Sequence, residues 1–431
     1  MDKKKIFLNK RFQIIGLIII LFCCSFKLWE EKTLSIEKCN WYKKTVDINI
    51  NNNVNEKFEY IENNEMSLPS QEVSLTLNAL YACLMDGESN RVLYTKNAYK
   101  QVPMASTTKI MTLLVTLEKA DLNSIVTVSA NAAKQPNVQL NINTGEQYIL
   151  GDLCYSLMLE SHNDTAVAIA EHVGGDVENF CNLMTQKARE LGAYHTSFKT
   201  PNGLDAQGHY TTAYDLSLIA SYAIQNPEFC KIVGTTTYQF DEVNRKRSFM
   251  VNNKDRFLYM MEGAIGIKTG FTGLAGYCFV GAIRTNEKTL ISTVLASGWP
   301  PHKEYKWTDT RKLMKYGQEN FTSYYLIERI QNKDTLRIPN SIPVVGGKVN
   351  DAKIALAHDI CNEKLLFRSD ETATVNTILR ESVNAPMKEG TKVGSMKYYI
   401  SGCFFKEVPI VLSEDVEKVD FFYLFRKLLQ L

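Results

Sequence analysis

The pattern of apolar and polar positions divides most of the chain into a helical middle flanked by strands. Apolar runs at 79–85 and 91–94, separated by a polar turn at 86–90, predict a pair of strands. Residues 106–230 show mainly helical spacing of apolar positions. Further runs within 264–295, separated by tight turns, predict three antiparallel strands. This order predicts an α+β fold, an antiparallel sheet whose helical cluster comes from the middle of the chain.

A different pattern begins after about residue 330, where short apolar runs alternate with turns rich in Pro, Gly, Asn and Ser. It predicts a small all-β domain over 329–415. The last segment, 416–431, is predicted to form an amphipathic tail helix. Its large apolar side chains share one arc of the helical wheel: Phe421, Phe422, Leu424, Phe425, Leu428, Leu429 and Leu431. A membrane surface would bury this arc, and so would packing of the tail on the β domain.

The N-terminus has the pattern of an export signal. Basic residues within 3–11 precede an apolar run at 14–26, which predicts a signal sequence or N-terminal anchor over 1–27. The run is short for a membrane-spanning helix, which needs about 20 residues, so a cleaved signal is favoured over an uncleaved anchor. Residues 28–70 are polar and rich in Asn, which predicts a flexible linker. We therefore expect an exported protein.

Composition narrows the class of protein. With 431 residues and a formal net charge of +2, the chain has room for two or three domains and no charge excess that would favour nucleic acid. The ten cysteines lack metal-ligand spacing. Several, such as Cys154 and Cys278, stand in apolar runs, which predicts buried thiols rather than a disulfide framework. No metal or other cofactor is expected.

Three short motifs follow one another along the chain: Ser106-Thr-Thr-Lys109, Ser161-His-Asn163 and Lys268-Thr-Gly270. Each is weak alone, because a second Ser-x-x-Lys occurs at 35–38 and a second Ser-x-Asn at 382–384. Their order, wide spacing and local context together predict a serine acyl-transfer site.

The first motif pairs a nucleophile with a base. A serine hydroxyl needs a base within hydrogen-bond reach, and residues three apart on a helix share one face. Apolar positions with helical spacing follow Lys109, so Ser106 is expected at the N-terminus of a buried helix, where amide N–H groups face the reacting carbonyl. A buried lysine can be neutral near neutral pH and act as the base. An amphipathic core helix with a surface serine and lysine is the alternative for this motif alone.

The second motif lies on a polar turn between two helical stretches. The Ser161 hydroxyl and the Asn163 amide on such a turn can relay a proton and hold a substrate amide. His162 between them is not expected to take part in the chemistry. A helix cap is the alternative for this motif, because Ser and Asn favour caps and turns.

The third motif begins a predicted hairpin. Lys268 and Thr269 offer a cation and a hydroxyl to a carboxylate, and Gly270 allows a ligand backbone to approach. The next backbone amide, that of Phe271, is expected to complete an oxyanion hole with the amide of Ser106. An edge strand that carries a lysine for solubility is the alternative.

These motifs and their surroundings resemble one known family. The stretches 102–112, 159–166, 200–204, 208–215 and 266–272 are similar to segments of the D-alanyl-D-alanine carboxypeptidases, the low-molecular-mass penicillin-binding proteins of serine peptidase family S11. The resemblance covers roughly residues 75–320 and extends more weakly to about 415. It implies an α+β, β-lactamase/transpeptidase-like domain, assigned here to 71–328, followed by the small all-β domain.

The resemblance also implies the role of each matching residue. Ser106 would be the acylated nucleophile, Lys109 its general base and Ser161 a proton relay. Asn163 would hold the substrate amide, while Lys268 and Thr269 would receive the terminal carboxylate of a D-Ala-D-Ala peptidoglycan stem peptide. β-Lactams would act as covalent inhibitors. Because the family often ends in an amphipathic helix, docking of the tail on the outer face of the cytoplasmic membrane is favoured over packing on the β domain.

Two other functions compete with a carboxypeptidase. A β-lactamase shares the three motifs, but one of class A needs a carboxylate that activates the deacylating water. The acidic candidates considered for it between Asn163 and Lys268, Glu190, Glu228 and Glu242, have no Asn four residues on, which weighs against it. A catalytically weak peptidoglycan-binding protein of the same fold would have no need of Ser106, Lys109 and Lys268 together. The sequence therefore favours a serine carboxypeptidase that matures the cell wall, with sporulation as one setting.

Overall fold

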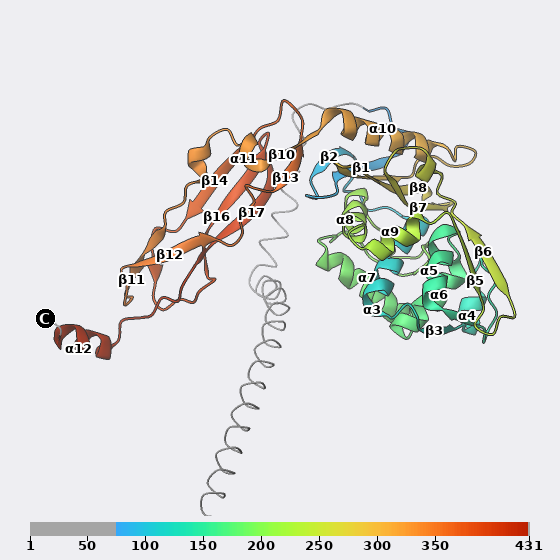
Figure 1. Cartoon of the computed structure of the whole chain (residues 1–431), viewed down its shortest axis with the longest axis horizontal. Helices are drawn as coiled ribbons and strands as arrows, with labels where there is room; N and C mark the ends of the chain where they lie inside the picture. Colours follow the sequence, from blue (N-terminus) through green and yellow to red (C-terminus); the bar gives the residue numbers. More distant parts are fainter. Residues whose placement is uncertain (1–74, 430–431) are drawn as a thin grey trace, which may run out of the picture. The chain divides into compact units, whose positions relative to one another are not determined.

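The structure, a computed structural model, describes residues 75–429 (Figure 1). The predicted signal and linker, at 1–27 and 28–70, lie outside the described residues, as does Leu431 of the predicted tail. The described residues form an α+β domain and a smaller all-β domain, as the sequence predicts.

The centre of the α+β domain is a five-stranded antiparallel sheet with the order β2-β1-β9-β8-β7. All of its strands fall on predicted runs: β1 (Tyr81–Asp86), β2 (Val92–Lys96), β7 (Ala264–Thr272), β8 (Gly276–Arg284) and β9 (Thr289–Leu295). The two ends of the domain's sequence therefore meet in one sheet, with β7 as a free edge.

Helices cover both faces of this sheet. On one face, α8 (Ala213–Ala223) contacts β1 and β9, and on the other α10 (Tyr305–Asn320) contacts β1, β8 and β9 (Figure 1). Consecutive strand residues point to opposite faces, so Cys83 enters the core under α8 while Leu84 enters the core under α10. Burial on both faces explains why the strands read as continuous apolar runs rather than as an alternating pattern.

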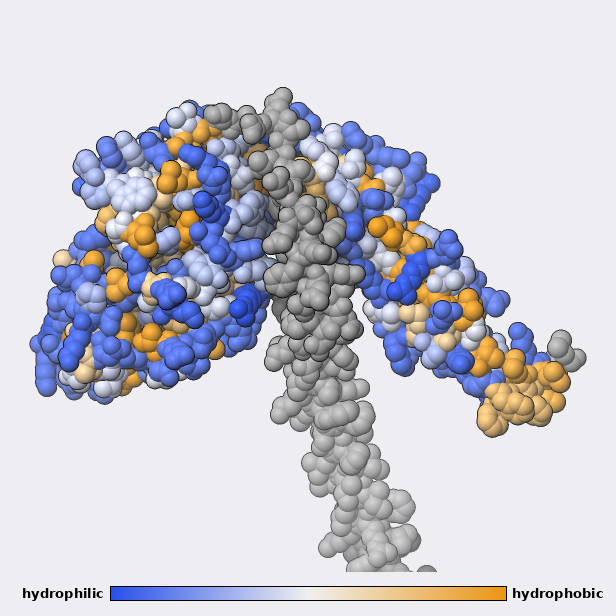
Figure 2. Space-filling model, turned by 180° about the vertical axis from the view of Figure 1, so that it is seen from behind, coloured by the Kyte–Doolittle hydropathy of each residue, from blue (hydrophilic) through white to orange (hydrophobic). Residues whose placement is uncertain are grey.

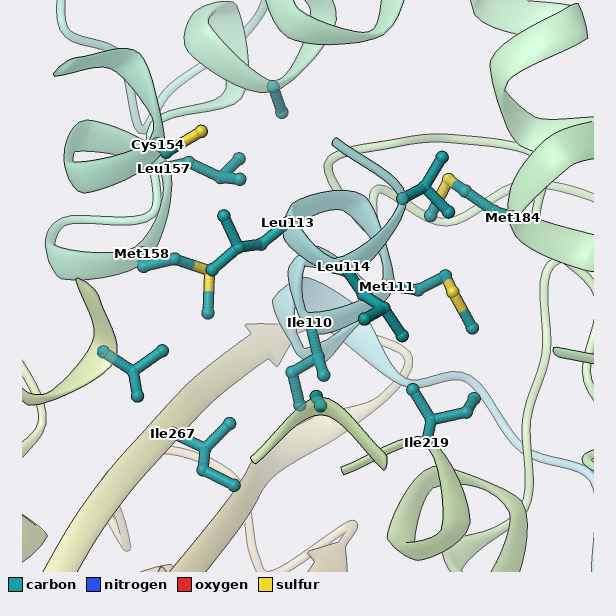
Figure 3. Close-up of a cluster of buried hydrophobic side chains, with 14 of the residues drawn as sticks. Ile110, Met111, Leu113, Leu114, Cys154, Leu157, Met158, Met184, Ile219 and Ile267 are labelled. Atoms are coloured by element: carbon teal, nitrogen blue, oxygen red, sulfur yellow. The ribbon is translucent and has the colours of Figure 1, made fainter. Parts of the chain in front are cut away.

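The middle of the chain forms the predicted helical cluster around α3 (Lys109–Lys119). Figure 3 shows Ile110, Leu113 and Leu114 of α3 among side chains from surrounding elements, such as Met158 of α5 and Ile267 of β7. The other helices of the cluster are α4 (Ala130–Ala133), α5 (Leu150–Leu159), α6 (Asn163–Gly174), α7 (Val177–Glu190) and α9 (Pro227–Gly234). Two small two-stranded sheets add β3 (Ile125–Thr127) with β4 (Gln147–Ile149), and β5 (Thr237–Asp241) with β6 (Ser248–Asn252).

The smaller domain has its own hydrophobic core and a six-stranded sheet with the order β14-β16-β17-β12-β11-β15. Its strands are β11 (Ser341–Val345), β12 (Asp351–Leu356), β14 (Ala373–Leu379), β15 (Val383–Asn384), β16 (Lys392–Ile400) and β17 (Cys403–Leu412). A separate pair joins β10 (Thr322–Tyr325) to β13 (Lys364–Phe367), and the short α11 (Leu326–Arg329) follows β10.

The chain's last described element is α12 (Phe421–Leu429), the predicted tail helix. Its apolar side chains are between 52% and 74% exposed and form a continuous hydrophobic surface (Figure 2). The helix is tied to the β domain by polar groups instead, because Tyr423 donates to the carbonyl of Lys348 and Asp420 pairs with the Lys348 ammonium. The alternative that the apolar arc packs on the β domain is therefore wrong for these residues. Within 75–429, no helix has the length and apolar character to cross a bilayer.

Candidate active site

The predicted nucleophile sits at the junction of a short 3-10 helix and α3. Ala105–Thr108 form this 3-10 turn, and α3 continues directly from Lys109. The apolar face of α3 is buried in the helical cluster, which fixes the direction of the turn. As the spacing predicts, Ser106 and Lys109 meet: Lys109 Nζ lies 3.0 Å from Ser106 Oγ.

Lys109 is fully buried and has three oxygen neighbours. Besides Ser106 Oγ, its Nζ lies 2.9 Å from Asn163 Oδ1 and 2.6 Å from the carbonyl oxygen of Asn202. The Asn163 amide is oriented by its nitrogen, which donates to the carbonyl of Pro136, so its oxygen faces the lysine. Burial, and then the nearby charge of Lys268, hold the pKa of Lys109 well below its usual range.

A neutral Lys109 amine would have two N–H groups and one lone pair. The oxygens of Asn163 and Asn202 carry no proton and can only accept, so they take the two N–H groups. The lone pair is then left facing the Ser106 hydroxyl. This geometry suits proton transfer from the serine to the lysine.

The second motif forms the turn between α5 and α6. Ser161 has a positive φ of 71°, and its buried Oγ has no hydrogen-bond partner among the described residues. Asn163 begins α6 and reaches Lys109. His162 is buried and bonded to Ser156 Oγ at 2.8 Å, so its ring is satisfied within the structure. Neither Ser161 nor Asn163 side chain serves as the cap of α6, whose N-cap residue is His162.

The third motif lies on β7, the free edge of the sheet. Phe271 is opposite Tyr277 of β8, while Tyr277 uses its N–H and C=O on the other side, toward Gly298 and Ser297. In an antiparallel pair, opposite residues either exchange both hydrogen bonds or none. The N–H of Phe271 therefore points away from the sheet, and so does the backbone of Thr269. Ile267, with the same alternation, confirms this direction because its N–H is bonded to the Asp255 carboxylate at 3.0 Å.

Lys268 and Gly270 lie toward the nucleophile. A Cβ at Gly270 would be 2.9 Å from the amide nitrogen of Ser106, so the strand and the 3-10 turn touch through backbone atoms. Lys268 is buried, which lowers its pKa to about 8, while the Asp255 charge acts in the opposite direction. Burial likewise raises the pKa of Asp255 to about 6.

Sequence reasoning missed two groups of this site. The stretch 200–204 was part of the resemblance, yet it predicts no role for the Asn202 carbonyl, because every residue type offers one. Asp255, which anchors the edge strand, carries no motif at all. Among residues 75–429 no set of His, Cys, Asp or Glu side chains could hold a metal ion.

An antiparallel sheet with a helical cluster, and a serine–lysine pair against an edge strand, together define a serine acyl-transfer enzyme. Residues 66–298 match the family model of D-alanyl-D-alanine carboxypeptidase, peptidase S11, and residues 328–418 match that of the penicillin-binding protein 5 C-terminal domain. The chain therefore belongs to the D-alanyl-D-alanine carboxypeptidase family.

Individual relatives agree with this family. The chain is 28% identical over 357 residues to D-alanyl-D-alanine carboxypeptidase DacF of Bacillus subtilis, which covers 80% of this chain and 88% of the relative. It is 34% identical over 258 residues to a Streptomyces D-alanyl-D-alanine carboxypeptidase, covering 56% of this chain and 88% of the relative. Among solved structures, penicillin-binding protein 5 from Haemophilus influenzae has a TM-score of 0.65 at 25% identity, covering 81% of this chain and all of that one.

Proposed function

We propose that this protein is a serine-type D-Ala-D-Ala carboxypeptidase, which removes the terminal D-alanine of peptidoglycan stem peptides through an acyl-enzyme on Ser106. Family membership supports the reaction class. The observation that carries the assignment to these residues is the environment of Lys109. Two obligate acceptors occupy its N–H groups, and its lone pair is left for the Ser106 hydroxyl 3.0 Å away.

This geometry supports the following acylation reaction. Ser106 Oγ attacks the carbonyl carbon between the last two D-alanines, and its proton passes to Lys109 Nζ. The oxyanion that forms is stabilised by the N–H groups of Ser106 and Phe271. The C–N bond then breaks, and the leaving D-alanine amine takes a proton through the Ser161 hydroxyl, whose buried Oγ has no partner of its own among the described residues. Water repeats the sequence on the ester and releases the shortened peptide.

The open edge of β7 suits a peptide substrate. An extended stem peptide can add to this edge as a further strand, because the backbone groups of Thr269 and Phe271 point outward. Lys268 and the Thr269 hydroxyl would then receive its terminal carboxylate. Both polar atoms of Asn163 are already bonded, to Lys109 and Pro136, so contact with the substrate amide would be an additional role beside holding the base.

The two alternatives fit less well. A class A β-lactamase needs a deacylating carboxylate from a Glu-x-x-x-Asn tetrad. The tetrad that stands between Asn163 and Lys268, Glu178 to Asn182, lies on α7 with both of these residues exposed, which does not suit that role. A purely binding protein gains nothing from burying the amino groups of Lys109 and Lys268, since removing a lysine amino group from water costs stability. Penicillin should therefore form a long-lived adduct rather than turn over.

The test is labelling with fluorescent penicillin, followed by proteolysis and mass spectrometry, alongside D-alanine release from a D-Ala-D-Ala peptide. The adduct is expected on the Ser106 peptide, and Ser106→Ala should abolish both activities with little change in the thermal transition. An adduct at another residue, or rapid penicillin turnover without an adduct, would contradict the proposed function of Ser106 as the nucleophile of a carboxypeptidase.

We further propose that the enzyme is exported and that α12 docks it on a membrane surface. Six large apolar side chains of this helix are exposed, and burying each contributes about 1.5–3 kcal/mol. Arg426 and Lys427 in its last turn add attraction to anionic headgroups. A membrane is the occupant that suits an apolar arc with adjacent cations.

Co-sedimentation with anionic liposomes tests this second proposal. A chain that begins at residue 28 should bind, and deletion of 419–431 should release it with acylation intact. Phe425→Glu should weaken binding strongly, whereas Phe404→Glu, at a comparably exposed aromatic residue on β17, should not. Equal partition of the full and truncated proteins would refute docking through α12.

A further inference from the structure

The peptide bond between Ala105 and Ser106 carries the proposed oxyanion donor at its nitrogen end, and its carbonyl end is held on two sides. Thr108 Oγ1 donates to the Ala105 oxygen at 2.8 Å. Opposite, the backbone of Gly203 comes so close that a Cβ there would lie 2.0 Å from the same oxygen. Ala105 itself has a φ of 49°, a conformation that non-glycine residues adopt only where the surroundings impose it. The direction of the Ser106 N–H is therefore set from the carbonyl end.

A buried histidine stands behind Thr108. His209 Nε2 lies 2.9 Å from Thr108 Oγ1, and its Nδ1 accepts the backbone N–H of Lys199 at 3.0 Å. Since Nδ1 accepts, the proton of the neutral ring is on Nε2, which donates to Thr108. Burial lowers the pKa of His209 to about 4, so the ring is neutral at neutral pH. The hydrogen bonds then run in one direction, from Lys199 N–H through His209 and Thr108 to the Ala105 carbonyl.

The loop that carries His209 is anchored next to the nucleophile. Two bonds, 2.8 and 3.0 Å long, join Thr211 to Val102 in the strand-like segment that leads into the 3-10 turn. A third contact joins Tyr210 to Ser197. The histidine is thus fixed relative to the peptide on which it acts.

We propose that His209 is a positioning residue of the oxyanion hole, which acts through Thr108 on the Ala105–Ser106 peptide. The inference rests on the proposed acylation of Ser106. A hydrogen bond to the carbonyl of an amide polarises the whole amide, and chains of such bonds strengthen one another by about 10–30% per bond. The hydrogen bonds from His209 through Thr108 to Ala105 therefore make the Ser106 N–H a better donor to the developing oxyanion and keep it directed at that oxygen. Neither side chain has to touch the substrate.

Four variants separate this role from simple packing. Thr108→Val removes the hydroxyl but keeps the shape, and His209→Leu removes both ring nitrogens. His209→Gln restores an acceptor for the Lys199 N–H and a donor for Thr108. Thr116→Val is the matched control, because Thr116 Oγ1 is also buried on α3 and donates to a carbonyl, that of Thr112 at 2.7 Å, without a link to Ser106.

The measurement is the acylation of the full protein by fluorescent penicillin, resolved into noncovalent binding and the acylation rate constant. Outright loss of an oxyanion donor costs about 10²–10³ in rate, so its weakening in Thr108→Val or His209→Leu should cost less, about 5- to 30-fold. Noncovalent binding should stay unchanged, because the oxyanion exists only after attack. The double variant that combines Thr108→Val with His209→Leu should be no slower than the slower single variant, since both changes interrupt the same series of hydrogen bonds.

Two further results complete the test. His209→Gln should acylate within about twofold of the unaltered protein, and the ester carbonyl of the penicilloyl adduct should absorb at higher infrared frequency in Thr108→Val than in Thr116→Val. Equal rates and equal frequencies in those two valine variants overturn the inference, as does a glutamine variant as slow as leucine. If His209→Leu does not fold, the comparison of Thr108→Val with Thr116→Val and the acylation rate of His209→Gln still test the inference. A protein that forms no adduct at all overturns the proposed function as well.

Discussion

The contact between the edge strand and the nucleophile predicts a strong effect of one added methyl group. In Gly270→Ala, the new Cβ would lie 2.9 Å from the amide nitrogen of Ser106 and 3.1 Å from both Thr107 N and Ala105 Cβ. Non-bonded carbon atoms attract one another best at separations of about 3.5–4.0 Å and repel one another at much shorter ones. These atoms belong to the backbone or are attached to it directly, so none can rotate away. Either β7 or the 3-10 turn must move by about half an ångström.

The magnitude follows from what is displaced. Inserting a methyl group into a closely packed position costs about 1–3 kcal/mol of stability. A displacement of 1 Å at a reacting group can cost about 10² in rate, so half of that, at an oxyanion donor, should slow acylation about 10- to 50-fold. Noncovalent binding of penicillin should change less, because the Ser106 amide acts on the transition state.

Acylation time courses with fluorescent penicillin and urea unfolding measure the two effects separately. Gly273→Ala is the matched control on the same hairpin, since a Cβ there meets nothing within 4 Å and no unusual φ is required. It should acylate normally and change stability by no more than about 0.5 kcal/mol. Wild-type acylation in Gly270→Ala would refute the reasoning, because the Ser106 amide would then not need its present position.

Two further predictions concern the buried lysines. Lys109→Arg should acylate at a small residual rate, because arginine cannot give up its proton in a protein; in the unaltered protein, acylation followed against pH should fall as the pH drops below the lowered pKa of Lys109. An arginine variant that acylates normally would exclude Lys109 as the base. Lys268 has a pKa lowered from 10.5 to about 8, so the unfolded state binds more protons between these values and stability should rise by about 3 kcal/mol as the pH rises through them. Urea unfolding of Lys268→Met should lack this rise, and parallel pH curves for the two proteins would contradict it.

The elements of the fold were predictable because each has a local period. The apolar spacing after Lys109 predicts α3 and places Ser106 and Lys109 on one face, and the structure has them 3.0 Å apart. The turns at 86–90 and after residue 272 predict which strands pair as hairpins. The joining of β1 to β9 has no such local signal, because it depends on how the helical cluster folds back over the sheet.

The groups that hold the reacting side chains in place could not be predicted from the sequence, for physical reasons. The Asn202 oxygen that bonds Lys109 belongs to the backbone, 93 residues away, and its residue type says nothing about its position. Ser161 adopts a positive φ of 71° that Ser seldom adopts and that no propensity predicts. Asp255 is a single carboxylate without a motif, recognisable only once it caps the Ile267 N–H. Motifs therefore find the reacting side chains, while the groups that hold them come from tertiary structure.

The charge of Lys268 affects how strong a base Lys109 is. The charge of Lys268 helps to depress the pKa of Lys109, and Asp255 partly offsets the cost of keeping Lys268 charged. A substrate carboxylate bound at Lys268 would cancel the repulsion that Lys109 feels, so the pKa of Lys109 would rise when the peptide arrives. Lys109 would then become a stronger base at the moment when the Ser106 proton must be removed. On this argument a terminal carboxylate contributes to the acylation rate as well as to binding, since it adjusts the base that activates the serine.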